Sequence, residues 1–143
     1  MDDLDHIAFD LHGVLTEAPH VFKIITSMLV AQGMKISIMS GPSREEVVAE
    51  LTKLGYERGI HYQHVISIVD YLRHKGIELW KDKKGGWETH AKEWWSSKGE
   101  LCKEFKVGLI IDDSPEYEAF VDKAETVFLL LKGQEDECNN SSR

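Results

Sequence analysis

Two apolar segments of the chain end in aspartates. Residues 7–9 are followed by Asp10, and residues 107–111 are followed by Asp112 and Asp113. A carboxylate that closes a hydrophobic strand is costly to bury unless a partner uses its charge. Two adjacent carboxylates also repel each other unless a cation lies beside them. We therefore expect the two strand ends to meet, so that the three carboxylates bind a hard cation of the Mg²⁺ type.

The elements that must position these aspartates alternate along the chain between strands and helices. Apolar periodicity and Gly or Pro breaks predict strands near residues 7–9, 35–39, 65–68, 107–113 and 126–131. Helices are predicted between them, with a short one over residues 69–74. This alternation predicts an α/β fold, a three-layer α/β/α Rossmann-like parallel sheet with helices on both faces.

The first predicted helix is indicated by apolar residues at helical spacing. Gly33 is placed to end it. The residues that give this periodicity are Val21, Ile24, Ile25, Met28 and Leu29.

Three later helices are indicated by capping signals. Ser43 with Glu46, and Ser97 with Glu100, have the spacing of a capping box. Ser114 and Pro115 form an N-cap and N1 pair, and residues 117, 120 and 121 of the helix that follows are expected to face inward. The second of these helices is therefore predicted to begin at Ser97.

Composition bounds the chain to one domain. It has 143 residues, and 42% hydrophobic with 29% charged residues is ordinary for a globular protein. We expect residues 1–132 to form the domain, with a small insertion at about 77–96. The polar, aperiodic residues 133–143 are predicted to be a disordered tail.

Charge and hydropathy exclude some partners. The net charge of −8 argues against electrostatic binding of nucleic acid, which needs basic patches. No segment approaches the ~20 apolar residues of a membrane span, and the acidic amino terminus does not read as a signal peptide. Cys102 and Cys138, the only cysteines, are then expected to be reduced thiols in a cytoplasmic protein.

Functional residues are expected at one edge of the sheet. Asp10, Ser40 and Asp112 all lie where predicted strands end. In parallel sheets the binding crevice lies outside the carboxyl ends of the strands, near the point where strand order reverses. These three residues are therefore predicted to share one site.

With these motifs in place, the chain resembles the haloacid dehalogenase-like hydrolase superfamily over about residues 5 to 131. Its first motif, a strand followed by Asp-x-Asp-Gly-Thr/Val, is matched by residues 10–16, Asp-Leu-His-Gly-Val-Leu-Thr. Ser40 matches the second motif, a lysine near a helix start would be the third, and Asp112-Asp113 matches the fourth.

The resemblance implies a Mg²⁺-dependent phosphatase of phosphate monoesters with an aspartyl-phosphate intermediate. Asp10 would be the nucleophile. Mg²⁺ would be held by Asp10, Asp112, Asp113 and the backbone carbonyl of His12. The phosphoryl oxygens would bind the side chain of Ser40, the amide of Gly41 and a lysine, which together form the implied phosphate site.

Two lysines are candidates for that last role. Lys98 follows the predicted cap Ser97 and precedes the acidic strand, so its ammonium would join a phosphate near a helix amino terminus. Lys84, beside Gly85-Gly86, is the rival. We favour Lys98 because the family's lysine commonly opens the helix just before the acidic strand.

His12 departs from the family pattern. Phosphatases of the family carry a second aspartate at this position, which protonates the leaving oxygen and activates water. Histidine also exchanges protons near neutral pH, so His12 is a candidate general acid and base. The alternative is that His12 contributes only its carbonyl, in a catalytically impaired metal- and phosphate-binding or regulatory protein.

The predicted insertion is too short for a full cap domain. A nearly capless site suits a bulky substrate whose phosphate protrudes, or a partner subunit that acts as a lid, so a homo-oligomer is one open alternative. The acidic segment Leu109–Pro115 resembles the nucleotidase-type branch, which points to nucleotide phosphates among the candidate small-molecule substrates. A phospho-receiver domain is disfavoured, because there the acidic pair follows the first strand.

Overall fold

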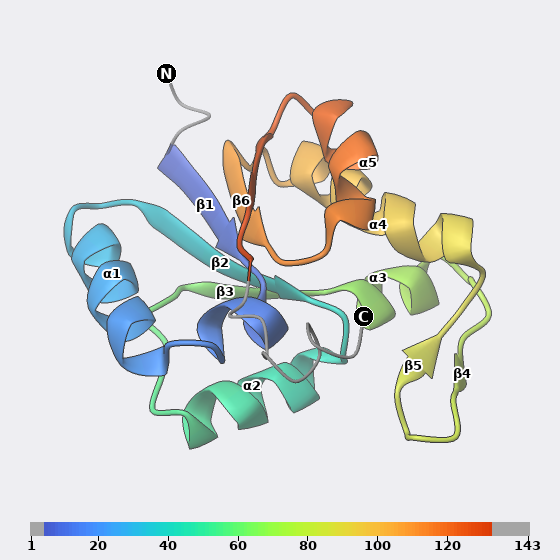
Figure 1. Ribbon diagram of the computed structural model, residues 1–143, viewed down its shortest axis with the longest axis horizontal. Helices are drawn as coiled ribbons and strands as arrows, with labels where there is room; N and C mark the ends of the chain where they lie inside the picture. The colour runs from blue at the N-terminus through green and yellow to red at the C-terminus, as the bar shows by residue number, and fades with distance from the viewer. Residues whose placement is uncertain (1–4, 133–143) are drawn as a thin grey trace, which may run out of the picture.

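The computed structural model describes residues 5–132, which form a five-stranded parallel sheet with helices on both faces (Figure 1). The predicted three-layer α/β/α class is therefore confirmed. The predicted disordered tail, residues 133–143, lies outside the described residues. The strands of the sheet are β1 (His6–Phe9), β2 (Lys35–Ser40), β3 (His64–Ser67), β6 (Leu109–Asp112) and β7 (Val127–Leu130).

The order of the strands is β3-β2-β1-β6-β7. The chain runs from β1 through β2 to β3 on one side, and then returns to place β6 and β7 on the other. Strand order thus reverses between β1 and β6, whose register pairs Phe9 with Ile111. Because the strands are parallel, the residues after Phe9 and Ile111 emerge together at one edge, where a crevice is expected.

Two helices cover one face of the sheet: α1 (Pro19–Ala31) and α2 (Arg44–Lys53). Ile7, Phe9, Ile36 and Ile38 point to this face because alternate strand residues share a face. Residues of α2 and of the turn after β1 complete this core, namely Val47, Leu51, Leu11, Val14 and Leu15, all fully buried.

The other face carries α3 (Ile68–His74), α4 (Ala91–Glu104) and α5 (Glu118–Asp122) (Figure 1). Ala8, Met39 and Ile110 point to this side from the three central strands. The helices pack on them through buried residues, which include Leu72, Leu101, Cys102 and Val121. Cys102 is a free thiol, and burial raises its pKa to about 12, so it is not a reactive nucleophile.

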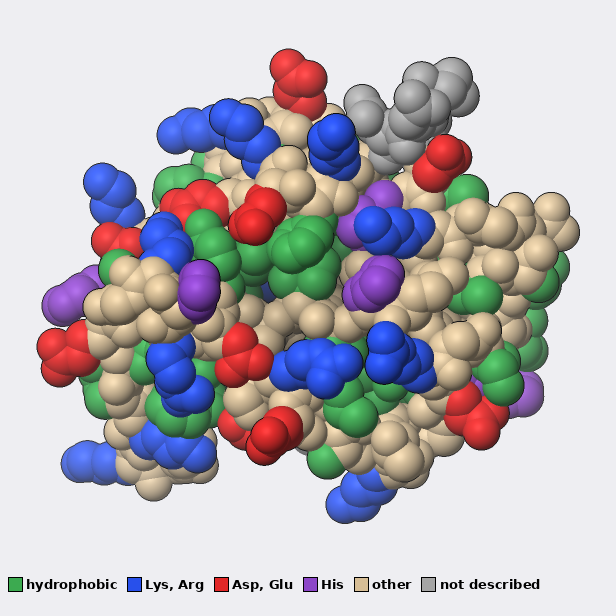
Figure 2. Space-filling model, turned by 180° about the vertical axis from the view of Figure 1, so that it is seen from behind, with side chains coloured by type: hydrophobic (Ala, Val, Ile, Leu, Met, Phe, Trp, Pro, Cys, Tyr) green, Lys and Arg blue, Asp and Glu red, His purple; other side chains and the backbone are tan. Residues whose placement is uncertain are grey.

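Helix α1 is confirmed, but of the five residues that predict it only Leu29 packs against the core. Phe22, Leu29 and Val30 pack against the core, and Thr26 is fully buried. The other four residues of the predicting periodicity are exposed, namely Val21, Ile24, Ile25 and Met28. Figure 2 shows hydrophobic side chains along the right-hand edge of the molecule, where α1 lies in that view.

The prediction that a helix begins at Ser97 is wrong. Helix α4 begins at Ala91 with His90 as its N-cap, so Ser97 lies in the middle of the helix. The Ser97 hydroxyl donates to the carbonyl of Trp94 at 2.5 Å instead of capping. Serine within a helix commonly bonds back in this way, so the Ser97–Glu100 spacing is not a cap here.

Three other boundaries differ from their predictions. The helix predicted after Ser114 is a 3₁₀ turn, η3 (Pro115–Tyr117), followed by the five-residue α5, and Ser114 makes no capping hydrogen bond through its side chain. The strand predicted over 65–68 ends at Ser67, whose hydroxyl accepts the N–H of Asp70 and caps α3. The insertion is shorter than 77–96, because α4 begins at Ala91.

That insertion is a two-stranded hairpin, β4 (Trp80–Lys81) and β5 (Trp87–Glu88). It attaches to α2 through Trp87, whose indole N–H donates to Glu46 at 3.0 Å. The guanidinium of Arg73 and the ammonium of Lys81 lie 5.0 and 4.6 Å from the centroid of the same ring. The segment between β3 and α4 therefore carries one short helix and a hairpin, and within residues 5–132 no helix has the length and apolar character to cross a bilayer.

Gly99 lets α4 approach α5 closely, beside Lys98. A Cβ placed on Gly99 would overlap the backbone carbonyl of Phe120.

We predict that Gly99→Ala lowers the free energy of unfolding by about 1–3 kcal/mol, measured by urea denaturation, because α5 must shift. This loss outweighs the ~1 kcal/mol that alanine gains in helix propensity. Lys103→Ala, an exposed change on the same helix, should stay within about 0.5 kcal/mol of the wild type. A Gly99→Ala protein as stable as the wild type would contradict the tight contact.

Candidate active site

Asp10 is the first residue beyond β1, and the sheet itself fixes its position. Its backbone N–H donates to the carbonyl of Ile111 at 3.0 Å, which ties the end of β1 to the end of β6. Its carboxylate accepts the N–H of Leu11 at 2.9 Å. The side chain is thus held at the mouth of the sheet, where Asp10 is only 7% exposed.

The turn after Asp10, η2 (Leu11–Leu15), combines buried anchors with one left-handed residue. Leu11, Val14 and Leu15 are buried, while Gly13 has φ of 82°. The N–H of Gly13 donates to the hydroxyl of Thr16 at 3.0 Å. Position 13 requires glycine for two reasons: its φ is positive, and a Cβ would collide with the Asp113 carboxylate.

The three predicted aspartates converge. Asp10, Asp112 and Asp113 each offer a carboxylate oxygen, and these oxygens all lie within 4.8 Å of one another. Asp112 is fully buried at the end of β6, and its Oδ1 accepts the N–H of Ser114 at 2.9 Å. A set of carboxylate oxygens from two strand ends fits a hard divalent cation such as Mg²⁺.

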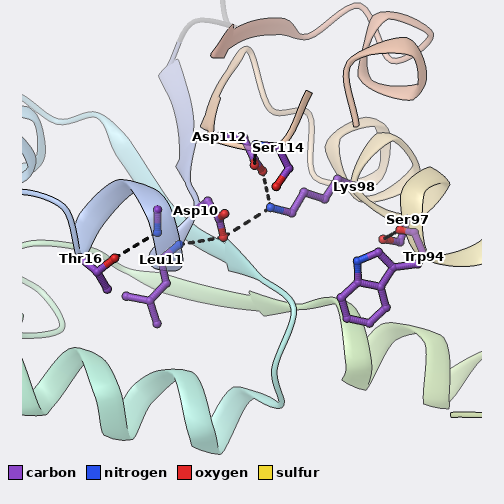
Figure 3. A network of polar contacts seen from close by, with 9 residues as sticks. Asp10, Leu11, Thr16, Trp94, Ser97, Lys98, Asp112 and Ser114 are labelled. Atoms are coloured by element: carbon purple, nitrogen blue, oxygen red, sulfur yellow. Dashed lines mark hydrogen bonds and ion pairs between the residues drawn. The ribbon is translucent and has the colours of Figure 1, made fainter. Parts of the chain in front are cut away.

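Lys98 reaches the aspartates from the middle of α4, and it is 1% exposed (Figure 3). Its Nζ donates to Oδ2 of Asp112 and lies 3.5 Å from Oδ1 of Asp10. The same ammonium lies 4.4 Å from the centroid of the Tyr117 ring, which is a cation–π contact. The predicted lysine is therefore at the cluster, although not at a helix amino terminus.

The charges of this cluster shift one another's titration. Burial raises the pKa of Asp10 most strongly, Lys98 lowers it, and the Asp112 and Asp113 carboxylates raise it again, so that it reaches about 7 from 3.8. Burial alone would lower the pKa of Lys98, but Asp10 and Asp112 outweigh burial and hold the pKa above its ordinary value. Because the site has three carboxylates and one ammonium, a further cation would offset its excess of acidic groups.

A cleft of about 310 Å³ opens above the cluster. Ser40 ends β2 and is 1% exposed, and the Trp94 ring packs close to Gly41. The cleft is lined by Asp10, His12, Gly13, Ser40, Gly41, Pro42, Trp94, Lys98, Asp113, Ser114 and Tyr117. Apart from Asp112, which lies buried within the cluster, every residue predicted for the site lines this one cleft.

His12 lies at the rim of the cleft and is about half exposed. Its Nε2 is 2.8 Å from Oε1 of Glu50 on α2. A carboxylate in this position fixes the orientation of an imidazole ring. The ring is thus held from the α2 side, and no hydrogen bond joins it to the aspartates described above.

Lys84, the rival lysine, is not at the site. It is exposed in the turn of the β4–β5 hairpin, where its backbone N–H donates to Asp82 at 2.8 Å. The sequence assigned no site role to five residues that are in or next to the site: Pro42, Trp94, Ser114 and Tyr117 line the cleft, and Glu50 contacts His12. Burial raises the pKa of Tyr117 to about 12, so it stays a neutral phenol under Lys98.

Comparison with known proteins supports the fold but names no function. No protein-family model and no curated protein matches the chain. Among solved structures, the chain is similar to the crystal structure of an uncharacterized protein from Corynebacterium glutamicum. The two share 14% sequence identity at a TM-score of 0.55, over 97% of this chain and 91% of the other. At this identity the likeness shows the fold alone.

The raised pKa of Asp10 predicts a specific pH dependence of stability in the absence of divalent cations. Below its unfolded pKa of 3.8, Asp10 is protonated in both states and contributes nothing. As the pH rises from about 4 towards 7, the unfolded chain ionises first, so the free energy of unfolding falls. Asp10→Asn removes this loss, and the variant should exceed the wild type by a few kcal/mol at pH 8 but not at pH 4.

Urea denaturation in EDTA across this pH range measures the difference. Asp122→Asn, a change at an exposed aspartate on α5, is the matched control and should run parallel to the wild type. Parallel curves for Asp10→Asn and the wild type would show that Asp10 is not held protonated by its surroundings.

Proposed function

We propose that the protein is a Mg²⁺-dependent phosphohydrolase of phosphate monoesters, similar to haloacid dehalogenase-like phosphatases. The observation that carries the proposal is the meeting of Asp10, Asp112 and Asp113 with the buried Lys98 at the switch point of the sheet. Two non-catalytic explanations of this cluster fit less well. A surface group of acidic residues does not need a buried lysine, and a structural ion pair does not need a third carboxylate beside an open cleft.

In this proposal the carboxylates of Asp10, Asp112 and Asp113 and the carbonyl of His12 would hold the metal. When bound, Mg²⁺ supplies positive charge that offsets the repulsion between a carboxylate and a phosphate dianion. Lys98 contributes a second positive charge next to Asp10, 3.5 Å from its Oδ1. Ser40 and the N–H of Gly41 line the same cleft as donors for phosphoryl oxygens.

The reaction uses one carboxylate and one proton carrier. An oxygen of Asp10 attacks phosphorus, the bond from phosphorus to the ester oxygen breaks, and an aspartyl-phosphate forms. The leaving oxygen takes a proton from the His12 imidazolium. His12 then removes a proton from water, whose oxygen attacks the phosphorus, and phosphate leaves with Asp10 restored. Nε2 of His12 is hydrogen-bonded to Glu50, so both proton transfers would have to use Nδ1 or break this contact.

The substrate class follows from the shape of the site. No cap domain stands over the cleft within residues 5–132, where the segment between β3 and α4 carries the short helix α3 and the hairpin β4–β5. An open cleft accepts esters whose alcohol part extends into solvent. Within this class, nucleotide phosphates stay a prediction. The cytoplasmic location and the absence of nucleic-acid binding also stay predictions.

The proposal predicts Mg²⁺-dependent release of phosphate from at least one member of a monoester panel that includes nucleotides. Asp10→Asn should abolish turnover, because the nucleophile is lost. Lys98→Met, which keeps the volume of the buried side chain, should lower kcat/KM about 10²–10³-fold. Lys84→Met is the matched control and should stay within about twofold of the wild type. Circular dichroism checks that each variant is folded. Turnover that survives Asp10→Asn, or that ignores Mg²⁺, would overturn the proposal.

A second function is favoured by the position of the His12 ring. Because Glu50 holds that ring from the α2 side, the protein can also be read as a metal- and phosphate-binding protein that has lost turnover. It would bind Mg²⁺ and inorganic phosphate, measured by calorimetry, without releasing phosphate from any ester.

His12→Asp separates the two functions. For a phosphatase that uses His12, His12→Ala should lower kcat about 10²-fold, and Glu50→Gln should lower it less. His20→Ala, an exposed histidine of α1, is the control and should have no effect. For the binding protein, the wild type is inactive and His12→Asp gains turnover. A wild-type enzyme indifferent to His12→Ala would exclude His12 as the proton carrier while leaving Asp10 to be tested separately.

A further inference from the structure

One large aromatic side chain of the cleft has no task in the proposed reaction. Trp94 of α4 is partly exposed and lines the cleft together with the charged residues. Binding of a metal and a phosphate dianion needs carboxylates, an ammonium and hydrogen-bond donors. The apolar faces of an indole ring serve none of these needs, so the position of this ring calls for a different explanation.

Trp94 is fixed beside the residues that are proposed to bind phosphate. It precedes Lys98 by one helical turn, so both side chains project from the same face of α4 (Figure 3). The edge of its six-membered ring packs on Gly41. A Cβ placed on Gly41 would lie 2.9 Å from Cζ2 and 3.1 Å from Cη2 of Trp94. The indole thus fills the space that a side chain at position 41 would need.

The indole is also the main apolar surface that the cleft offers to a ligand. Tyr117, the other large ring that lines the cleft, is only 5% exposed and lies under the Lys98 ammonium. Trp94 is partly exposed, and it packs against the core beneath α4 as well as on Gly41. A ring that the protein already holds in place loses little conformational entropy when a ligand binds to it.

The geometry of phosphoryl transfer directs the alcohol part of an ester along the walls of the cleft. The attacking and leaving oxygens lie roughly in line through phosphorus. Asp10 attacks from the end of β1, so the ester oxygen points away from the sheet. No cap domain covers the cleft within residues 5–132, so the walls alone would bind the alcohol part. Trp94 is the largest side chain of those walls.

We propose that Trp94 is a specificity-determining residue, on which an aromatic ring in the alcohol part of the substrate stacks. This inference rests on the proposed phosphatase function and narrows its substrates to monoesters of alcohols that carry a flat ring. A flat ring buries one whole face against the indole, whereas a flexible chain in an open cleft would need a second wall. Two aromatic rings also attract each other through their quadrupoles.

A purely structural role for Trp94 has different consequences. A tryptophan that only fills the space between α4 and Gly41 would affect the stability of the protein and the binding of every ester alike. A stacking residue affects an ester with an aromatic ring more than a matched ester without one. The test therefore compares pairs of esters that differ in the ring alone.

One pair is benzyl phosphate and cyclohexylmethyl phosphate, and the other is a purine nucleoside monophosphate and the same sugar phosphate without its base. The leaving oxygen is of the same kind within each pair. Wild-type kcat/KM should favour the aromatic member of at least one pair about three- to tenfold, mainly through KM. Trp94→Leu should reduce this preference to within about twofold, and Trp94→Phe, which keeps a ring, should retain part of it. Trp80→Leu is the matched control, because Trp80 is exposed on β4 and does not line the cleft.

Binding of phosphonates tests the inference separately from turnover. Benzylphosphonate and cyclohexylmethylphosphonate are not hydrolysed, and calorimetry in the presence of Mg²⁺ measures their affinities. Tighter binding of benzylphosphonate that is lost in Trp94→Leu, with unchanged circular dichroism, supports stacking even where no ester is turned over. Trp94→Phe, the milder change, provides the same comparison where Trp94→Leu is unfolded.

Failure of the inference is distinct from failure of the proposed function. Turnover without any preference for a ring overturns the role of Trp94 and leaves the phosphatase in place. So does a preference that Trp94→Leu leaves intact or that Trp80→Leu removes equally. A protein that neither hydrolyses an ester nor binds a phosphonate overturns both.

Discussion

The site depends on three carboxylates and one ammonium that share a small space at the ends of β1 and β6. Carboxylate oxygens of Asp10, Asp112 and Asp113 lie within 4.8 Å of one another, and Lys98 supplies one positive charge beside them. Two unit charges 4 Å apart near a protein surface interact by about 4 kcal/mol. The fold must hold this cluster together against its own repulsion. The hydrogen bond from the Asp10 N–H to Ile111 does so directly, because it fastens one strand end to the other.

The close approaches around the cluster follow from the same constraint. Gly13 leaves the space that the Asp113 carboxylate fills, and Gly99 lets α4 come close enough to α5 for Lys98 to lie over the Tyr117 ring. Lys98 is buried, contacts the carboxylates of Asp10 and Asp112, and also lines the cleft, so it is the positive charge that the proposed phosphate would meet there. In the proposed function, these four side chains would serve both the cation and the phosphate.

The sequence was sufficient for the parts of the fold that depend on local pattern and insufficient for those set by tertiary contacts. Apolar runs that end in Asp10 and Asp112 predicted two adjacent strand ends, because burying charge there needs a purpose. Ser97 was misread, because its spacing to Glu100 is that of a cap while its hydroxyl serves the helix interior. Glu50 carried no signal, and Tyr117 was predicted to face inward but not to contact Lys98. Their roles come from where α2 and η3 are placed, which no local spacing records.

Helix α1 is a case in which the sequence pattern is clear but does not decide which side of the helix packs on the sheet. Its residues offer two apolar stripes, and the exposed one has the more regular helical spacing, so the sequence predicts the helix but not its rotation. The rotation is set by Lys23, which reaches the end of α2, and by Thr26, whose hydroxyl bonds the Phe22 carbonyl at 2.7 Å and so can be buried at little cost. Met28 and Ile24 are left outside. A polar residue at either position would leave the packing of the core unchanged, because neither side chain packs there. An isolated chain gains nothing from such a stripe, and exposed apolar area of this kind promotes association. The internal packing of the molecule therefore does not account for this exposed stripe.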